Sequence, residues 1–354
     1  MYPALAALQA LKSEHSGVET LWVGIEGGME ADLLRREGIA FTGIPAAGLH
    51  GVGLRALPGN LLRLARGLVA SQHILQRFQP DVLFFTGGFV AGPMAVAARL
   101  RTKPVPILLY VPDIEPGLAL RVLARFADRI AVSASDSQGY FRQKVTVTGY
   151  PVRASFSKWT RESGRFSLGL RADLPVLLAA GGSKGARTIN AAVTSQLPDL
   201  LALTQVVHIT GQSDWEAAQA NLQQLTPAQR ERYKAFPYLH EEMGAALAAA
   251  DLVVARAGAS ALGEFPFFGL PAIVVPYPHA WRYQRINAEY LRRHLAAIMV
   301  QDEALEHELL TVVQDLIGNP AKREAMRTAM RRLAQPHAAG GLAAQLLALG
   351  GGRS

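Results

Sequence analysis

The chain alternates short apolar runs with helical periods from one end to the other, and this alternation is interrupted once. The break comprises Gly149-Tyr150-Pro151 and the polar stretch 155–165, after which the same alternation restarts. Short apolar strands separated by amphipathic helices are typical of parallel sheets that carry helices on both faces. The sequence therefore predicts two doubly wound, Rossmann-like α/β domains with a hinge near 150–155. A length of 354 residues agrees with two domains.

The apolar runs fix the expected order of the elements. We expect strands at 21–25, 40–44, 81–85, 105–109, 129–132 and 144–147, and then at 176–180, 205–210, 233–236, 252–255 and 272–275. Helical periods cover 57–78, 302–333 and 340–349. The predicted divisions are an N-terminal domain over 1–153, a C-terminal domain over 154–333, and a last helix with a flexible tail over 334–354.

The beginning of the first domain departs from this pattern. A doubly wound sheet opens with a strand, a glycine-rich turn and a helix. Here the residues 3–11 already have the pattern of the first helix. We expect that the strand and the turn before this helix are absent, and that the sequence begins in the middle of the motif.

The composition excludes several classes of protein. Half of the residues are hydrophobic and 18% are charged, which favours a packed globular chain over a disordered one. The sequence has no cysteine, which excludes disulfides, thiolate metal sites and a cysteine nucleophile. No apolar run reaches the roughly 18 residues of a membrane-spanning helix. The nine histidines show no metal-ligand spacing, and we expect no metal and no cofactor.

The net charge of +8 is concentrated in one stretch, 41–103. Its basic residues are Arg55, Arg63, Arg66, Arg77, Arg99, Arg101 and Lys103, against the single acid Asp81. Leucines alternate with these residues, and basic plus apolar residues favour an anionic membrane surface. An ordinary basic helix of a globular protein explains the pattern equally well. Nothing in the sequence resembles an RNA or DNA module, and we expect no nucleic-acid partner.

Two strand-to-helix turns carry glycines. The stretch 176–190, VLLAAGGSKGARTIN, passes from an apolar strand through Gly181, Gly182, Ser183, Lys184 and Gly185 into a helix. Glycines let backbone N–H groups approach a phosphate, and a helix N-terminus favours negative charge. The stretch 86–93, TGGFVAGP, also follows a strand directly. Either segment is also consistent with a tight turn that binds nothing.

Further polar residues follow the strands of the second domain. In LVVARAGASALGE, over 252–264, Glu264 is expected about a turn and a half into a helix, where a carboxylate can accept both hydroxyls of a ribose. Gln284 and Asn287 share one helix face, and their amides suit sugar hydroxyls. Arg153 stands at the hinge and suits a phosphate or an ion pair. Each of these residues is also consistent with an ordinary polar surface.

One acidic pair lies near the middle of the first domain. Asp113 and Glu115 form a D-x-E sequence between two prolines, similar to the acidic metal motif of some sugar transferases. One pair of acids is a weak indication of a metal site, and a structural role for both residues is the simpler interpretation.

Taken in this order, the motifs resemble the MurG family of bacterial N-acetylglucosaminyltransferases. The resemblance rests on TGGFVAGP, GYPVR, GGSKGARTIN, RAGASALGEFPFFGLPAIVVPYP and Q-x-x-N-A, and it extends from residue 2 to about residue 333. It implies a GT-B fold, with two Rossmann-like domains and an interdomain cleft. It also implies inverting transfer of N-acetylglucosamine from UDP-N-acetylglucosamine to the muramyl C4 hydroxyl of lipid I, giving lipid II and UDP.

The resemblance assigns a role to each motif. The C-terminal domain would bind the donor, with Arg153, Gly181–Gly185, the His240 backbone, Gly258, Ala259, Glu264, Gln284 and Asn287. The acceptor-side residues would be Gly87, Gly88 and Gly92. An enzyme with a polyprenyl acceptor is expected at the cytoplasmic face of the membrane as a peripheral protein, which fits the basic and apolar helix.

The sequence departs from the family at three places. The family opens with a strand and a GGTGGH-like loop that this sequence lacks, so we expect a misassigned start or a truncation. The family's His-Glu-Gln-Asn reads Tyr110-Val111-Pro112-Asp113 here, which puts the acceptor and the catalytic base in question. Asp113 is the candidate base. Finally, Tyr150 replaces an asparagine, and Lys184 replaces a glutamine.

Two alternatives remain open at this stage. A GT-B transferase that uses the same donor with a different acceptor would explain the change at 110–113. A catalytically inactive nucleotide-sugar binder would explain the absent first loop. A sugar-nucleotide epimerase fits less well, because it needs no membrane-facing surface.

Overall fold

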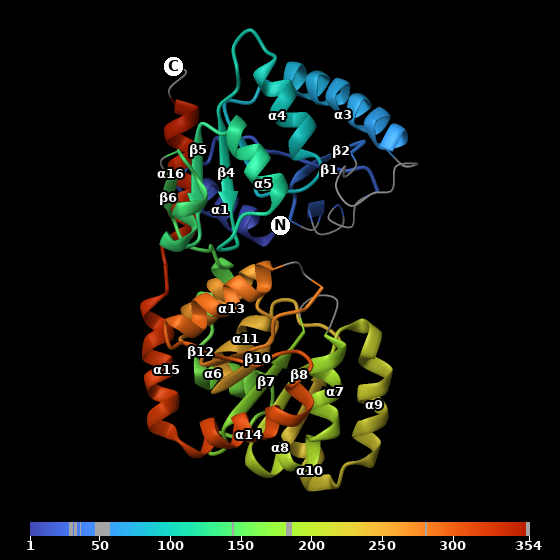
Figure 1. Cartoon of the computed structure of the whole chain (residues 1–354), viewed down its shortest axis with the longest axis vertical. Helices are drawn as coiled ribbons and strands as arrows, with labels where there is room; N and C mark the ends of the chain where they lie inside the picture. Colours follow the sequence, from blue (N-terminus) through green and yellow to red (C-terminus); the bar gives the residue numbers. More distant parts are fainter. Residues whose placement is uncertain are drawn as a thin grey trace. The chain divides into compact units, whose positions relative to one another are not determined.

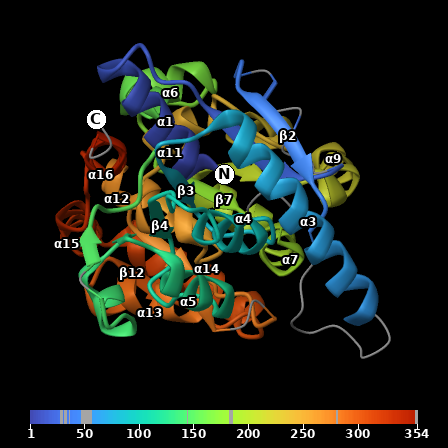
Figure 2. The ribbon, with the colours of Figure 1, turned by 90° about the horizontal axis from the view of Figure 1, so that it is seen from above.

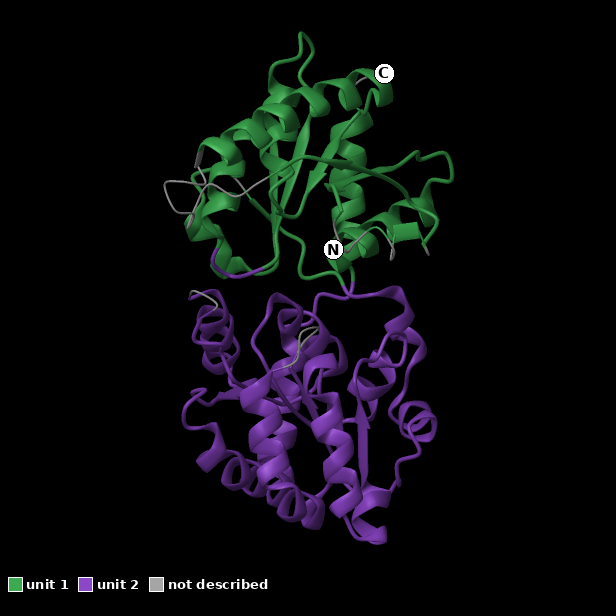
Figure 3. Ribbon diagram, turned by 90° about the vertical axis from the view of Figure 1, so that its right-hand side faces the viewer, with its two compact units in different colours: residues 1–112, 116–151, 337–354 green, residues 113–115, 152–336 purple. Residues whose placement is uncertain are grey.

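The protein forms two compact units (Figure 3). The structure is a computed structural model, and it describes residues 1–27, 31, 34–35, 37–46, 57–143, 145–181, 186–279 and 282–351. Unit 1 comprises Met1–Pro112, Pro116–Pro151 and His337–Ser354, and unit 2 comprises Asp113–Glu115 and Val152–Pro336. Each unit is built from parallel strands covered by helices, in two sheets in unit 1 and in one sheet in unit 2, which confirms the predicted fold class.

Unit 1 is built from strand and helix repeats, closed by a helix from the end of the chain (Figure 1). Its strands are β1 (Leu21–Ile25), β2 (Ala40–Ile44), β3 (Leu83–Phe85), β4 (Ile107–Val111), β5 (Arg129–Val132) and β6 (Val145–Val147). Its helices are α1 (Tyr2–Glu14), α3 (Leu57–Phe78), α4 (Ala91–Arg99), α5 (Leu118–Leu123) and α16 (Ala338–Gly350), with 3-10 turns η2 (Ala124–Phe126) and η3 (Ser135–Tyr140).

The central strand β4 shows why this sheet is covered on both faces. Its residues alternate between two cores because successive side chains of a strand point to opposite faces. Ile107, Leu109 and Val111 belong to the core with α4 and α5. Leu108 and Tyr110 belong to the core with α1 and α16. Helix α3 lies beside α4, as Figure 2 shows.

The strands of unit 1 form two separate sheets. β3, β4, β5 and β6 pair in that order, whereas β1 pairs with β2. Within the described residues, neither β1 nor β3 has a second strand partner. Both strands line one apolar cavity of about 510 Å³, together with residues of α1, α3 and α16. This is the arrangement expected of a doubly wound sheet without one interior strand.

Unit 2 has a single six-stranded sheet (Figure 1). Its strands are β7 (Val176–Ala180), β8 (Gln205–Ile209), β9 (Tyr233–Phe236), β10 (Leu252–Ala255), β11 (Ala272–Val274) and β12 (Ala297–Met299). Its helices are α6 (Arg161–Ser167), α7 (Arg187–Ser195), α8 (Leu197–Leu203), α9 (Trp215–Gln224), α10 (Pro227–Arg232), α11 (Met243–Ala249), α12 (Glu264–Phe268), α13 (Tyr283–Arg293), α14 (Leu305–Gly318) and α15 (Pro320–Arg332), with 3-10 turns η4 (Ala154–Lys158), η5 (Gln212–Asp214) and η6 (Ala259–Leu262).

The strand order of unit 2 determines where a ligand can bind. The order is β12-β11-β10-β7-β8-β9, and all pairs are parallel. The chain starts at β7 and builds outwards in both directions, so the order reverses between β7 and β10. In open α/β sheets, ligands bind at the carboxyl ends of the strands at such a reversal. The expected binding site of unit 2 therefore lies where β7 and β10 end.

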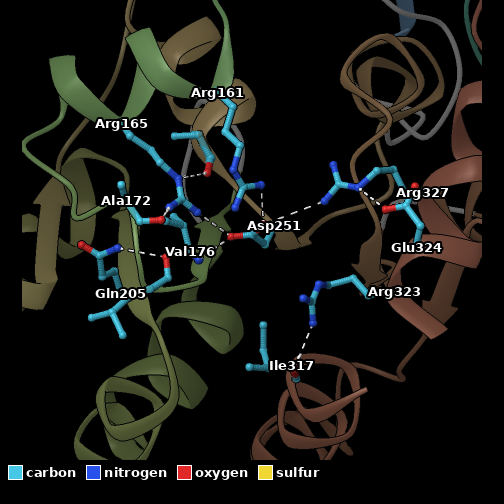
Figure 4. A network of polar contacts seen from close by, with 12 residues as sticks. Arg161, Arg165, Ala172, Val176, Gln205, Asp251, Ile317, Arg323, Glu324 and Arg327 are labelled. Atoms are coloured by element: carbon cyan, nitrogen blue, oxygen red, sulfur yellow. Dashed lines mark hydrogen bonds and ion pairs between the residues drawn. The ribbon is translucent and has the colours of Figure 1, made fainter. Parts of the chain in front are cut away.

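A buried ion cluster fixes the opposite end of the same two strands (Figure 4). Asp251, directly before β10, accepts hydrogen bonds from Arg165 Nη2 at 2.8 Å and from the Val176 backbone N–H at 2.9 Å. Its other oxygen lies 2.5 Å from Arg161 Nη1 and 3.9 Å from Arg327 Nη2. One carboxylate thus links α6, the start of β7 and α15.

The elements agree with the sequence prediction over most of the chain. Several strands have the predicted bounds, such as β1, β2 and β10. Strand β12 was not predicted, because three residues between two helices show no distinct period. The last helix, α16, packs in unit 1 against α1 and β4. Residues 352–354, in the predicted tail, and Lys144 lie outside the described residues.

Candidate active site

A cavity of about 600 Å³ lies at the reversal point of unit 2. Gly181 follows β7 directly, and Gly258 lies in the turn after β10. Both residues line the cavity, together with Ala186, Arg187, Thr188, Met243, Leu247, Arg256, Ser260, Glu264, Phe265, Tyr277 and Gln284. Gly182, Ser183, Lys184 and Gly185, which the sequence analysis proposed for phosphate, lie outside the described residues.

The N-terminal turn of helix α7 presents Arg187 and Thr188 to this cavity. The first N–H groups of a helix have no partner within the helix and carry partial positive charge. Within the described residues, α7 has no side-chain cap at its N-terminus. The helix start, Gly181 and Arg187 therefore offer an anion the donors and the positive charge that it needs.

Arg256 also lines the cavity and contacts the first turn of α7. It forms an ion pair with Asp302, and its Nη2 donates to Thr188 Oγ1 at 2.6 Å. Thr188 Oγ1 in turn donates to Asp302 at 2.7 Å. The guanidinium lies over the Tyr277 ring, 5.1 Å from the ring centre. Arg256 is not among the predicted site residues, although its place directly after strand β10 is a signal for such a role.

A buried polar network joins α7 to strand β8. His208 on β8 lies between Tyr233 Oη at 2.8 Å and Asn190 Oδ1 at 3.0 Å. Asn190, on α7, donates to the Thr210 carbonyl and to Asp214, both at 2.7 Å. Burial lowers the pKa of His208 to about 4, so the imidazole is neutral at physiological pH. The network fixes the helix that carries Arg187 and Thr188.

Glu264 also lines the cavity. Glu264 is the first residue of α12, and the 3-10 turn η6 precedes it. The prediction that Glu264 lies one and a half turns into a helix is therefore wrong, because a 3-10 turn replaces the first part of that helix. Burial raises the pKa of its carboxyl to about 7, and the positive charge of Arg153 opposes that rise. Arg153 Nη1 donates to the His240 carbonyl at 2.8 Å, and its guanidinium lies over the Phe156 ring.

Gln284 and Asn287, predicted to share one helix face, have different surroundings. Gln284 lines the cavity, and its Oε1 accepts a hydrogen bond from the Tyr277 N–H at 2.9 Å. Asn287 is fully buried and is not among the residues that line the cavity. Its amide contacts Asp113, Ile114 and Ala257. Ala259, also predicted at this site, is partly exposed in η6.

The D-x-E segment belongs to unit 2, although its neighbours in sequence belong to unit 1. Glu115 accepts hydrogen bonds from two guanidinium nitrogens of Arg282, Nε at 2.5 Å and Nη2 at 2.7 Å. Burial raises the pKa of the Asp113 carboxyl, and the hydrogen bond from Asn287 opposes this shift. In the described part of the chain, no three His, Asp or Glu side chains gather closely enough to hold a metal ion.

The glycines predicted on the acceptor side lie at the carboxyl end of β3 in unit 1. Gly87 and Gly88 have φ angles of +111° and +91°, a conformation that a side chain would strain. Both line the apolar cavity beside β1 and β3. Gly92 lies in the first turn of α4. Tyr110, where the family has a histidine, is fully buried and bonds through its hydroxyl to Ser133.

Two Rossmann-like units, one with a cavity at its reversal point, are the architecture of the GT-B fold. The glycosyltransferase family 28 N-terminal domain matches residues 1–132, and the family 28 C-terminal domain matches residues 176–340. The chain belongs to glycosyltransferase family 28 and, within it, to the MurG family.

Named relatives match nearly the whole chain. A protein of Roseiflexus sp. (strain RS-1) is called UDP-N-acetylglucosamine--N-acetylmuramyl-(pentapeptide) pyrophosphoryl-undecaprenol N-acetylglucosamine transferase. It is 38% identical over 97% of this chain and 91% of its own length. A protein of the same name from Desulforudis audaxviator (strain MP104C) is 38% identical over 96% of this chain and 92% of its own length.

Solved structures agree with this assignment. MurG of Acinetobacter baumannii is similar with a TM-score of 0.76 and 27% identity, over 98% of this chain and 95% of its own. The UDP-GlcNAc 2-epimerase of Neisseria meningitidis has a TM-score of 0.68 at 13% identity, over 98% of this chain and 96% of its own, and shows a shared fold alone.

Proposed function

We propose that this protein transfers N-acetylglucosamine from UDP-N-acetylglucosamine to the muramyl C4 hydroxyl of lipid I, giving lipid II and UDP. The observation that carries the proposal is the match to relatives named for this transfer over 96–97% of the chain. The cavity at the reversal point of unit 2 supports it, because it joins a helix N-terminus, arginines and a carboxylate.

The donor would extend along this cavity from Glu264 to Gln284. The Glu264 carboxylate would accept both ribose hydroxyls, and the backbone at His240, Gly258 and Ala259 would contact the nucleoside. The α7 N-terminus, Gly181 and the segment 182–185 would bind the diphosphate, with Arg153 nearby. Gln284 Oε1 is held by the Tyr277 N–H. The amide nitrogen of Gln284, without a partner among the described residues, would then donate to a sugar hydroxyl.

The chemistry would be a direct displacement with inversion. The acceptor oxygen forms a bond to the anomeric carbon while the bond from that carbon to the diphosphate oxygen breaks. The leaving UDP takes the electron pair, and its growing negative charge is stabilised by the α7 N-terminus. The acceptor proton passes to the Asp113 carboxylate, and a raised pKa favours that transfer. The glycines Gly87, Gly88 and Gly92 would contribute to acceptor binding.

The decisive measurement is UDP release from UDP-N-acetylglucosamine with and without a short-chain lipid I analogue. We expect release only with the acceptor, and none with an analogue that has hydrogen in place of the C4 hydroxyl. Donor binding without release would favour a catalytically inactive binder. Release with another polyprenyl-linked sugar but not with lipid I would favour a different acceptor. Either result would contradict the proposed transfer.

We further propose that α3 contacts an anionic membrane surface on the cytoplasmic side. Leu61, Leu62 and Val69 on this helix are 55–56% exposed. Arg63, Arg66 and Arg77 are exposed on the same helix, whereas Arg55 lies outside the described residues. Apolar side chains can insert below the headgroups while arginines contact anionic lipid. Among the described residues, no helix combines the length and hydropathy that crossing a bilayer requires.

Replacing Leu61, Leu62 and Val69 together with serine should weaken binding to phosphatidylglycerol vesicles at least tenfold. Each fully buried aliphatic side chain contributes about 1.5–3 kcal/mol. Partial insertion of three such side chains therefore exceeds the roughly 1.4 kcal/mol that a tenfold change in affinity requires. Co-sedimentation with vesicles measures the effect. Phe166→Ser is the control, because Phe166 is 90% exposed but lies on α6 in unit 2. Equal binding by the triple variant and the parent protein would refute the role of α3.

A further inference from the structure

Three residues between two prolines, Asp113, Ile114 and Glu115, belong to unit 2 although they interrupt the sequence of unit 1. Helix α13 and its N-cap residue, Arg282, hold this segment. The Asn287 amide bonds to Asp113 and to the Ile114 N–H, and Arg282 pairs with Glu115 through two nitrogens. The Glu115 side chain is 4% exposed and that of Arg282 is 60% exposed, so the bidentate pair holds a buried carboxylate from the surface side.

Both hydrogens of the Asn287 side-chain amide form hydrogen bonds within the protein. Its Nδ2 donates to Asp113 Oδ1 at 2.8 Å and to the Ala257 carbonyl at 3.1 Å. Its Oδ1 accepts from the Ile114 N–H at 3.1 Å. An amide nitrogen has only two hydrogens, so none is left for a sugar hydroxyl. Neither Asn287 nor Asp113 lines the donor cavity directly, and both reach it through the Ala257–Gly258 turn. A direct contact with the donor is therefore not the role that this geometry supports.

The Asp113 carboxylate is held by one oxygen only. Oδ1 accepts the Asn287 bond, whereas Oδ2 has no hydrogen-bond partner among the described residues. The bond to Oδ1 fixes the orientation of the carboxylate, and Oδ2 is the oxygen that can accept a proton. The Asn287 bond to Ala257 also ties this carboxylate to the turn at Gly258, which lines the donor cavity. Asp113 is thus oriented relative to the donor site by a single amide.

We infer that Asn287, together with the Arg282–Glu115 ion pair, positions the Asp113 carboxylate relative to the Ala257–Gly258 turn of the donor cavity and acts on the reaction only through Asp113. The inference rests on the proposed transferase function, in which Asp113 Oδ2 takes the proton of the acceptor hydroxyl. It assigns Asn287 a different role from the donor contact that the sequence motif implied. Asn287 and Arg282 are positioning residues, and Gln284 remains the donor-binding amide of α13.

The test compares kcat with the Kd for UDP-N-acetylglucosamine in the full-length protein. Asn287→Ala should lower kcat about tenfold and leave the donor Kd within about twofold of the parent value. Gln284→Ala, three residues away on the same helix, should weaken donor binding instead. Asp113→Asn should lower kcat by about 100-fold or more, as expected for loss of a general base. In the Asp113→Asn background, Asn287→Ala should change kcat by less than about twofold.

A second pair of variants covers the case that Asn287→Ala does not fold. The Arg282 side chain is 60% exposed, so Arg282→Met should be tolerated. We expect a lower kcat with unchanged donor Kd for Arg282→Met, and recovery of most of the loss for Arg282→Lys. Two results would overturn the inference. One is that Asn287→Ala weakens donor binding as much as Gln284→Ala does. The other is that Asn287→Ala lowers kcat by the same factor in the Asp113→Asn background as in the parent protein.

Failure of the proposed function has a different signature. A parent protein that binds the donor but shows no acceptor-dependent turnover overturns the transferase and this inference with it. A fully active Asp113→Asn variant leaves the transferase intact, and it overturns both the base assignment and the positioning of Asp113.

Discussion

Asp251→Ala should destabilise unit 2 by about 3–5 kcal/mol, the usual cost of removing one partner of a buried ion pair. Arg165 is 4% exposed, and its Nη2 donates to Asp251 at 2.8 Å. Without Asp251, this guanidinium remains buried without its carboxylate, although it keeps its bonds to backbone carbonyls such as Ala172. The Val176 N–H at the start of β7 loses its partner as well. The substitution therefore leaves an uncompensated charge and an unpaired donor.

Thermal unfolding measures this loss. For a domain of this size, each kcal/mol shifts Tm by about 2–4 °C, so the transition of unit 2 should fall by on the order of 10 °C. Asp173→Ala is the control, because Asp173 forms a 2.7 Å ion pair with Arg171 in which both side chains are about half exposed. Exposed pairs contribute at most about 1 kcal/mol. Similar Tm values for the two variants would show that the buried cluster adds no more than a surface pair.

The sequence predicts the elements well, because apolar runs and helical periods are local properties. Strand β10 and helix α3 have the predicted bounds for this reason. The residues of the donor cavity could also be predicted in part. Gly181 and Gly258 each follow a strand, and the carboxyl ends of parallel strands meet at one edge of a sheet. Local pattern therefore suffices where topology brings the ends of strands together.

The contacts that the sequence does not reveal join distant segments. Asp113 and Asn287 lie 174 positions apart, and no local period relates them. Helix α16 shows the same limit, since its apolar pattern predicts a helix but not that it packs on α1 of unit 1. Asp302, which pairs with Arg256, follows a strand too short to recognise. In each case the partner is chosen by tertiary packing, which a single sequence does not display.

Glu264→Ala should weaken binding of UDP-N-acetylglucosamine by about 100-fold or more at pH 8. The proposed contact is a pair of charge-assisted hydrogen bonds from the ribose hydroxyls, and each such bond contributes about 1.5–3 kcal/mol. Calorimetry gives the Kd directly. Glu241→Ala is the control, since Glu241 is a carboxylate of the same unit with a side chain that is 78% exposed and does not line the cavity. An unchanged Kd for Glu264→Ala would remove the basis for placing the ribose there.

The same carboxylate predicts how donor binding depends on pH. Burial raises its pKa to about 7, so the ionised form falls from about 90% at pH 8 to about 10% at pH 6. Only the ionised form accepts from both hydroxyls, so the apparent Kd should rise roughly tenfold over this range. Without donor, the sign is opposite. Stability should fall as pH rises from about 4.5 to 7, because the folded protein holds this proton more tightly than the unfolded chain.

Glu264→Gln separates these effects from other titrations. Glutamine has nearly the same shape but no ionisation, so both the Kd and this part of the stability should become independent of pH between 6 and 8. UDP-N-acetylglucosamine is the suitable ligand, because it lacks the terminal phosphate whose second pKa near 6 would add its own titration. A Kd that keeps its pH dependence in Glu264→Gln would mean that another group controls donor binding. A flat profile in the parent protein would mean that the ribose does not depend on the ionised carboxylate.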